Sequence, residues 1–364
     1  MRNNNDDDDD DNDSDNKNLS LRPTVNAYNK LIKAYGIAGD FVRAEDVFRL
    51  LLDGESDSTI PRANHKSWVQ IMKSFAFSHV EDSNEIVQSL FEEMSSAYRA
   101  GEEEYLPQTD AYNVLIRTIG KKQDGPQKAE AMLFEMIERF RNGEEEVRPN
   151  SETFRSVLAA YKYTGRGRKF TAASVAAKVE QILQIREGLL LSYNNVESDD
   201  SSESDERIFR TAMWIVGRSR DTKKAKRAKR IFQKYSGTFL SNRLHYYLLM
   251  SCANQDGNSE VKFEAFQTAL GVMKELRSLS ELEIDSSITG MFIKACNNLM
   301  PDGPKRDDIV KHTFQDCCRR GYANEFVLNE FGKVASEPLQ LEILGGYSVD
   351  GVRIPKSWCD NIVN

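Results

Sequence analysis

The stretch PTVNAYNKLIKAYGIAGDFVRAEDVF, residues 23–48, contains the pattern that decides the fold. Its aromatic Tyr28 is followed by apolar residues three, four and seven positions later. This spacing places the four side chains on one face of an α-helix. A break containing Gly36 and Gly39 separates this helix from a second one, whose apolar face begins at Ala44. The stretch therefore predicts a helical hairpin.

The same quartet of residues recurs along the chain. Seven instances begin at Tyr28, Trp68, Tyr112, Phe154, Phe209, His245 and Thr289. Successive quartets start 40, 44, 42, 55, 36 and 44 residues apart, which is typical of helical repeat arrays with loop insertions. One hairpin cannot bury its own apolar face, so neighbouring hairpins must stack. The sequence predicts an all-α fold, a right-handed solenoid of about seven helix-turn-helix repeats with insertions between repeats.

The net charge of −8 over 364 residues is unevenly distributed. Residues 1–18 contain eight Asp against two basic residues, and residues 197–206 contain six acids and no base. Segments without apolar residues cannot offset the entropy of ordering the chain. We therefore predict a disordered acidic tail over 1–19 and a disordered acidic loop over about 194–206. The remainder of the chain has a net charge of +4.

The domain prediction follows from these segments. The repeat array is expected over 20–320, with a C-terminal capping helix and tail over 321–364. The first 18 residues lack the character of a targeting peptide. No stretch approaches the roughly 18 to 20 apolar residues of a membrane helix, so no membrane span is expected. Five scattered Cys indicate a reducing compartment rather than a disulfide framework.

The sequence contains no recognisable catalytic or metal-binding motif. The four His lie far apart, and His312 with Cys317 and Cys318 does not align on one helical face. No Gly-rich phosphate loop or Ser nucleophile motif is present. We expect no catalytic residue, no metal site and no small-molecule cofactor.

Three strings resemble pentatricopeptide repeats: residues 23–48, 107–136 (PQTDAYNVLIRTIGKKQDGPQKAEAMLFEM) and 149–165 (PNSETFRSVLAAYKYTG). They share a Pro five residues before the aromatic, a Leu-Ile pair or its equivalent and, in the first two, an Ala-x-x-x-Phe or similar second helix. The resemblance covers about residues 20–320. It implies binding of single-stranded RNA, mostly organellar transcripts, along the groove of the first helices, to support processing, stability or translation. By this resemblance the location is a mitochondrion or plastid; without it, the cytoplasm is expected.

The resemblance also implies which residues contact RNA bases. In that family the residue after the aromatic, and the residue after the Pro of the next unit, read the edge of one base. Carried over to this chain, the rule gives four pairs: Asn29 with Asn64, Asn113 with Asn150, Arg155 with Asp205, and Arg210 with Ser241. Amides donate and accept along a base edge, which suits Asn to this role. Asp110 and Glu152 stand beside the same groove and are expected to repel phosphate.

The most basic stretch, Arg218–Arg230, is the other candidate RNA contact. It includes Lys223, Lys224 and Arg227, and such a patch binds phosphates through counterion release. A solvated helix face partly neutralised by the acidic loop is the alternative interpretation. We hypothesise that this loop folds over the patch in the absence of RNA.

Two function classes remain. The first is a non-catalytic RNA-binding protein, and the second is a helical-repeat scaffold similar to tetratricopeptide arrays that binds a protein partner. The net charge of the remainder, the Asn pairs and the basic stretch favour RNA, whereas Asp110 and Glu152 favour a protein.

Overall fold

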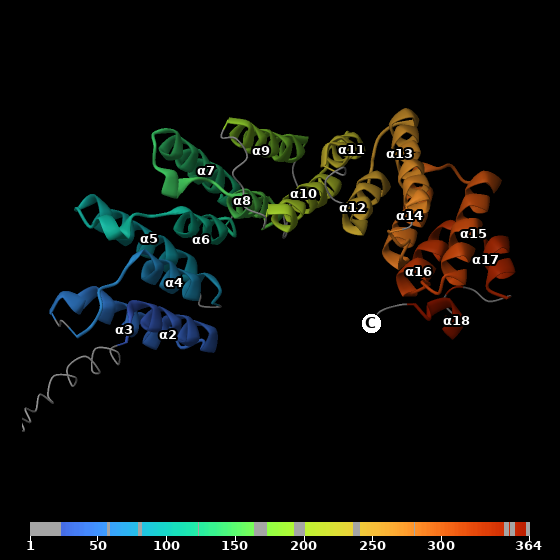
Figure 1. Ribbon diagram of the computed structural model, residues 1–364. Helices are drawn as coiled ribbons and strands as arrows, with labels where there is room; N and C mark the ends of the chain where they lie inside the picture. Colours follow the sequence, from blue (N-terminus) through green and yellow to red (C-terminus); the bar gives the residue numbers. More distant parts are fainter. Residues whose placement is uncertain are drawn as a thin grey trace, which may run out of the picture. The chain divides into compact units, whose positions relative to one another are not determined.

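The computed structural model is helical throughout its described part (Figure 1). It describes residues 23–56, 59–78, 82–122, 124–163, 173–192, 201–235, 241–279, 281–345, 349 and 354–361. By their contacts the residues form two units, which divide close to Pro149. The predicted all-α repeat fold is confirmed. The predicted acidic tail over 1–19 lies outside the described residues.

The first unit consists of three helix pairs. They are α2 (Val25–Ala38) with α3 (Phe41–Leu52), α4 (His65–Ala76) with α5 (Ser83–Arg99), and α6 (Thr109–Ile119) followed by α7 (Gly125–Arg141), whose first two residues group with the second unit. Short 3-10 helices η2 (Asp53–Ser56), η3 (Glu103–Tyr105) and η4 (Glu145–Val147) lie in the connections. We call the first member of each pair a first helix and the other a second helix.

The second unit repeats this arrangement. Its helices are α8 (Ser151–Tyr163), α9 (Ala173–Ser192), α10 (Ser201–Arg218), α11 (Lys224–Tyr235), α12 (Asn242–Ala253), α13 (Ser259–Ser278), α14 (Ser286–Leu299), α15 (Pro304–Arg319), α16 (Glu325–Val334), α17 (Glu337–Ile343) and α18 (Lys356–Cys359). First helices pack in succession, α8 on α10, α10 on α12, α12 on α14 and α14 on α16.

The C-terminal region differs from the predicted capping helix and tail. Residues 321–361 contain α16, α17 and α18, and α16 packs on α14 as an additional first helix. Leu328 takes the place of the residue that begins the earlier quartets, and the residues three, four and seven positions later are Phe331, Gly332 and Ala335. Because Gly332 supplies no apolar side chain, the quartet pattern did not reveal this helix.

Side-chain caps set where the first helices begin. Thr24, Asn64, Asp285 and Asn324 each accept a hydrogen bond from the backbone N–H three residues later. Such caps satisfy N–H groups that have no partner within the helix. Thr24 directly follows Pro23, and a proline is tolerated at the start of a helix but not in its interior.

The predicted quartets form the core. In α4, α6, α8, α10, α12 and α14 all four residues of each quartet are buried. Trp68, 1% exposed, packs edge-on against Phe48 and Tyr105, with ring centres 4.8 Å and 5.7 Å away. In α2 the quartet is only partly covered, and Leu31 is 39% exposed. Among the described residues no first helix lies before α2 to cover it.

Glycine permits close approach of α2 and α4. A Cβ built on Gly36 would lie 2.5 Å from the Cβ of Ser74 and 3.1 Å from its Cα. Gly36→Ala should therefore destabilise the first unit by about 1–3 kcal/mol, since the helices must move apart. The measurement is the urea midpoint followed by circular dichroism.

Gly271 provides the matched control for this substitution. It lies within α13, and a Cβ there would meet no atom within 4 Å. Gly271→Ala should stabilise by about 0.5–1 kcal/mol, because alanine loses less backbone entropy in a helix. Equal effects of the two substitutions would contradict the close contact at Gly36.

Candidate nucleic-acid interface

The solvent-facing side of the first helices repeats at fixed sequence positions. Relative to the residue that begins each quartet, the described side chains two residues before it and five and nine residues after it are exposed or half-buried, except Met250, which is buried. The residue one position after it lies in the same stripe, because these offsets share one face of a 3.6-residue helix. We call this stripe the first-helix face and describe it separately in each unit.

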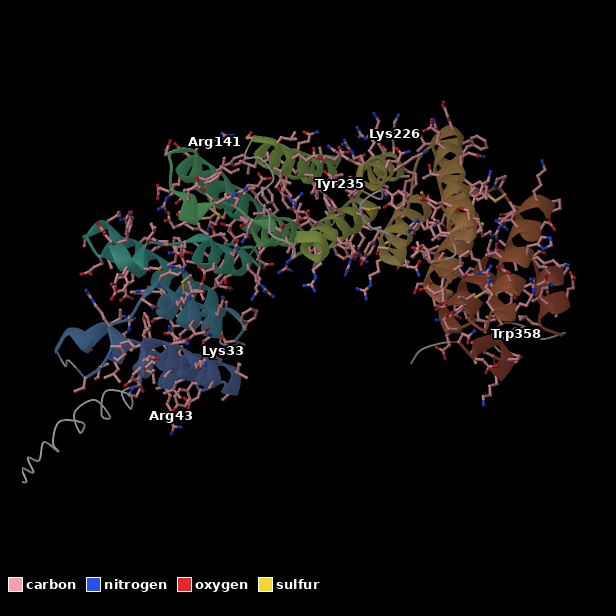
Figure 2. All side chains as sticks on the ribbon, viewed as in Figure 1. Lys33, Arg43, Arg141, Lys226, Tyr235 and Trp358 are labelled. Atoms are coloured by element: carbon pink, nitrogen blue, oxygen red, sulfur yellow. The ribbon has the colours of Figure 1, made fainter. Side chains whose placement is uncertain are left out.

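In the first unit, cations occupy the same position on three successive first helices. Lys33 on α2, Lys73 on α4 and Arg117 on α6 each stand five residues after the start of their quartet. Lys33 and Arg117 are exposed and Lys73 is half-buried; Lys33 is labelled in Figure 2. The Arg117 guanidinium lies 4.7 Å from the centre of the Phe77 ring. An exposed aromatic beside a cation is typical of surfaces that bind single-stranded nucleic acid.

Asp110 on this face is paired rather than free. Its Oδ1 lies 2.5 Å from Nε2 of His65, whose Nδ1 is 3.0 Å from the Leu106 carbonyl oxygen. Burial alone would raise the pKa of Asp110, but the hydrogen bond and charge of His65, with the charge of Lys73, hold that pKa below its usual value. The carboxylate thus has a cationic environment within the protein. This pairing offsets part of the negative charge of Asp110, and the expected repulsion of phosphate by Asp110 stays a prediction.

Glu152 in the second unit is also paired. Its Oε2 accepts a hydrogen bond of 2.7 Å from Nε of Arg155, and Oε1 contacts the same guanidinium. Glu206 similarly lies 3.8 Å from Arg210. Arg155 and Arg210, two of the predicted RNA contacts, are therefore half-buried cations that each neutralise a neighbouring carboxylate.

Cations and an aromatic ring gather at the C-terminal ends of α8 and α10. Lys162 Nζ lies 5.1 Å from the Trp214 ring and the Arg218 guanidinium lies 5.0 Å from it. Burial lowers the pKa of Lys162, and the charges of Arg155 and Arg210 lower it further. The charges of Lys162 and Arg218 beside one aromatic ring make the local potential positive. This cluster is suited to phosphate and a stacked base.

Of the four Asn predicted to read bases, two are buried and two cap helices. Asn29 and Asn113 are 9% and 8% exposed. Asn64 Oδ1 accepts a hydrogen bond of 3.2 Å from the Ser67 N–H, and Asn150 Oδ1 accepts one of 3.1 Å from the Thr153 N–H. Both are capping interactions, which engage the side-chain oxygen. A base-reading role for these residues stays a prediction.

The basic stretch contains exposed cations and cations that contact acceptors within the protein. Lys223 is exposed. Lys224 is 4% exposed, and its Nζ donates to the Asn254 carbonyl oxygen at 2.7 Å. Arg227 donates from Nε to Asp221 Oδ2 at 2.5 Å and also contacts Glu180. Lys224 and Arg227 are therefore held by internal acceptors, and a phosphate-binding role for them stays a prediction.

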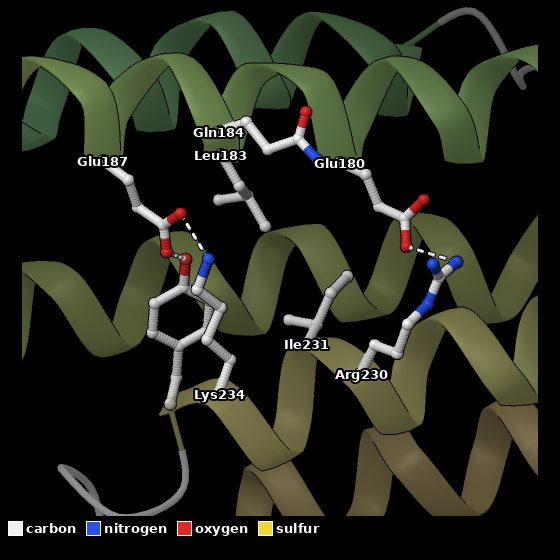
Figure 3. A pocket seen from close by; sticks show the side chains of 8 residues that line it. Glu180, Leu183, Gln184, Glu187, Arg230, Ile231 and Lys234 are labelled. Atoms are coloured by element: carbon white, nitrogen blue, oxygen red, sulfur yellow. Dashed lines mark hydrogen bonds and ion pairs between the residues drawn. The ribbon is translucent and has the colours of Figure 1, made fainter.

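The acids that face this stretch come from α9. Figure 3 shows Glu180 beside Arg230 and Glu187 beside Lys234. The charged atoms of Arg230 and Glu180 are 3.0 Å apart, and the Tyr235 hydroxyl donates a hydrogen bond to Glu187. These pairs line a small pocket between α9 and α11. Burial and the hydrogen bond from Tyr235 to Glu187 raise the pKa of this tyrosine. Helix α9 thus neutralises one side of α11.

The predicted acidic loop is partly helical. Helix α10 begins at Ser201, so the prediction of disorder is wrong for 201–206. Asp205 contacts Arg186 and accepts a hydrogen bond of 2.9 Å from Ser151, while Glu206 accepts one of 2.7 Å from Ser241. These two acids are paired away from the basic stretch, which contradicts the hypothesis that they screen it. Residues 194–200 lie outside the described part.

The cations of the first-helix face were not predicted, although the sequence contains a signal for them. Aligning the quartets and reading the position five residues after their start gives Lys33, Lys73, Arg117 and Lys294 in one column. Trp214 occupies this position on α10. The apolar quartets drew attention to the core positions, whereas this column lies on the opposite side of the helix.

Other kinds of site find no support in the described residues. They contain no group of three or more His, Cys, Asp or Glu placed to hold a metal ion. No described helix combines the length and apolarity that crossing a bilayer requires. Burial raises the pKa of the Cys252 and Cys296 thiols to about 12, so both are inert core residues at neutral pH.

Comparisons with known proteins find similarity to solved structures. No protein-family model matches the sequence, and no curated protein matches it. The crystal structure of PPR10 from maize, described as a pentatricopeptide repeat protein, aligns with 85% of this chain at 17% identity and a TM-score of 0.41. The chain covers 40% of the maize protein's length. The packing of its own helix pairs shows that this chain is an all-helical repeat protein.

Proposed function

We propose that this protein binds single-stranded RNA on the first-helix face and acts without catalysis. The observation that carries the proposal is the column of cations at one repeat position, Lys33, Lys73 and Arg117, on successive helices of the first unit. Cations spaced along a surface bind a phosphate chain by releasing its counterions. The acids on the same face are paired with His65 and Arg155, which leaves the lysines and Arg117 to attract phosphate.

The second unit supports the same proposal through Trp214 and its two cations. Aromatic rings stack on any base, and neighbouring cations hold the phosphates, so this combination binds RNA with little sequence preference. Because the four candidate Asn are buried or engaged in caps, sequence selection is expected to be limited. In keeping with the resemblance to pentatricopeptide repeats, we propose that the RNA is an organellar transcript, which the bound protein protects or positions for processing or translation.

A binding measurement with the full chain tests this function. A mixed pool of 5′-labelled single-stranded RNA should be retained at 50 mM salt and largely released at 300 mM, because each phosphate contact contributes about 0.7 to the salt exponent. The retained RNA should remain uncut after prolonged incubation with Mg²⁺. An absence of retention at 50 mM salt would overturn the proposal and favour the helical-repeat scaffold that binds protein.

A further inference from the structure

The second unit has a basic cleft on its second helices, away from the first-helix face. It lies between α11 and α13 and has a volume of about 480 Å³. Lys223, Lys226 and Lys229 line it on the α11 side. Lys226 is labelled on α11 in Figure 2. The cleft is a cavity with three cations, not a flat helix surface.

These three lysines differ from the neighbouring cations that the protein uses internally. Lys224 and Arg227 are bound to acceptors on other segments, whereas Lys223, Lys226 and Lys229 are exposed. None of the three forms an ion pair with a residue that the structure describes. Like charges this close together repel one another, and a bound polyanion would relieve that repulsion.

An exposed aromatic ring lines the opposite side of the cleft. Phe263 on α13 is 62% exposed. A ligand that covers this ring would remove apolar surface from water, which favours binding. One acid, Glu264, also lines the cleft, so cations outnumber acids there by three to one. Lysines beside an exposed ring suit a nucleotide, because the lysines can bind its phosphate and the ring can stack on its base.

Exposed cations also connect the first-helix face to this cleft. Arg218 ends α10 beside Trp214, Arg220 follows in the turn, and Lys223 precedes α11 at the rim of the cleft. Arg218, Arg220 and Lys223 are all exposed. The phosphates of an RNA strand bound near Trp214 could therefore contact Arg218, Arg220 and Lys223 in turn along the α10–α11 turn.

We propose that single-stranded RNA passes over the α10–α11 turn and enters the cleft between α11 and α13. There Lys223, Lys226 and Lys229 bind phosphates and Phe263 stacks on a base. This inference rests on the proposed RNA binding and adds a second contact surface to it. An acidic peptide shares the attraction to lysine but has no base to stack on Phe263.

The test compares charge reversal in the cleft with charge reversal elsewhere in the second unit. The cleft variant is Lys223→Glu, Lys226→Glu and Lys229→Glu together. The matched control reverses Lys274, Arg277 and Lys305, exposed residues of the second helices α13 and α15. With a 30-nucleotide RNA, the cleft variant should bind about tenfold or more weaker and lose about 2 from the salt exponent. The control should retain the wild-type values.

Phe263→Ala adds a readout specific to stacking. It should weaken RNA binding about tenfold without changing the salt exponent. RNA containing 4-thiouridine should crosslink to a peptide that includes residue 263, and the crosslink should be absent from the cleft variant. Circular dichroism and the urea midpoint establish that each variant is folded.

Three outcomes would overturn the inference. If wild-type protein binds RNA and the cleft variant binds as the control does, the cleft contact is wrong while the proposed function stands. If wild-type protein retains no RNA, both fail. If the cleft variant loses binding to a poly-glutamate peptide but keeps full RNA affinity, the cleft serves an acidic protein instead.

Discussion

Reversing the charges of Lys33, Lys73 and Arg117 together should reduce the affinity for single-stranded RNA by on the order of 100-fold at 0.1 M salt. These side chains occupy one repeat position on α2, α4 and α6. Three lost phosphate contacts lower the salt exponent by about 2, and this change alone gives a loss of that size. Fluorescence anisotropy at several salt concentrations measures both quantities. None of the three is in the buried core, so the fold should be retained.

The control for this experiment uses the same unit and the same change in charge. Arg43, Arg99 and Arg141 are exposed on the second helices α3, α5 and α7. Arg141 is labelled on α7 in Figure 2. Reversing these three should lower RNA affinity only slightly, through the change in net charge. If both triple variants lost affinity equally, RNA would be attracted by overall charge, and the first-helix face would have no special part.

The repeat fold was predictable because its signals are local. A quartet spans only eight residues, and its spacing alone determines which side chains share a helix face. The Pro that precedes Thr24 and Asn150 also places the helix starts within a residue or two. Stacking then follows, since a single hairpin leaves its apolar face in water.

The roles of individual polar residues were less predictable because their partners lie far away in the sequence. Lys224 donates to the carbonyl of Asn254, 30 residues later, and Arg227 contacts Glu180, 47 residues earlier. A run of basic residues gives no information about such partners. Only the folded structure distinguishes these internally paired cations from exposed ones such as Lys226.

The Asn residues illustrate a second limit. Asn64 and Asn150 stand at the position that the family resemblance assigns to base reading, and this position is also the N-cap of the next first helix. Asn is favoured at both kinds of position. Sequence pattern alone therefore cannot separate them. The structure shows the capping interaction in both cases.

Composition is a misleading indicator of structure at the start of α10. Acidic residues without apolar neighbours indicate disorder, yet acids are also favourable in the first turns of a helix. Asp205 is paired with Arg186, which is 4% exposed, so a buried cation depends on this acidic segment. This long-range ion pair stabilises the helix despite the acidic composition of the segment.

Arg227→Met should destabilise the second unit by about 3 kcal/mol. Asp221 is 2% exposed, and Arg227 is the cation that contacts its carboxylate. Removing Arg227 leaves a buried charge without that partner, which costs more than the pair itself contributes. The measurement is the urea midpoint, with hydrogen exchange of α9, α10 and α11 to localise the effect. Lys226→Met, at an exposed neighbouring position, should leave the midpoint unchanged.

A double substitution separates this explanation from a simple loss of packing. In Asp221→Asn with Arg227→Met, the buried negative charge is removed along with its partner. The combined destabilisation should then be smaller than the sum of the two single effects, as expected for residues in direct contact. Strictly additive effects would show that the ion pair is not what holds α11 in place. Arg227 forms ion pairs with Asp221 and Glu180, so the RNA affinity of correctly folded Arg227→Met should stay within a few fold of wild type. Substitution of the cleft lysines should instead change RNA affinity without changing stability.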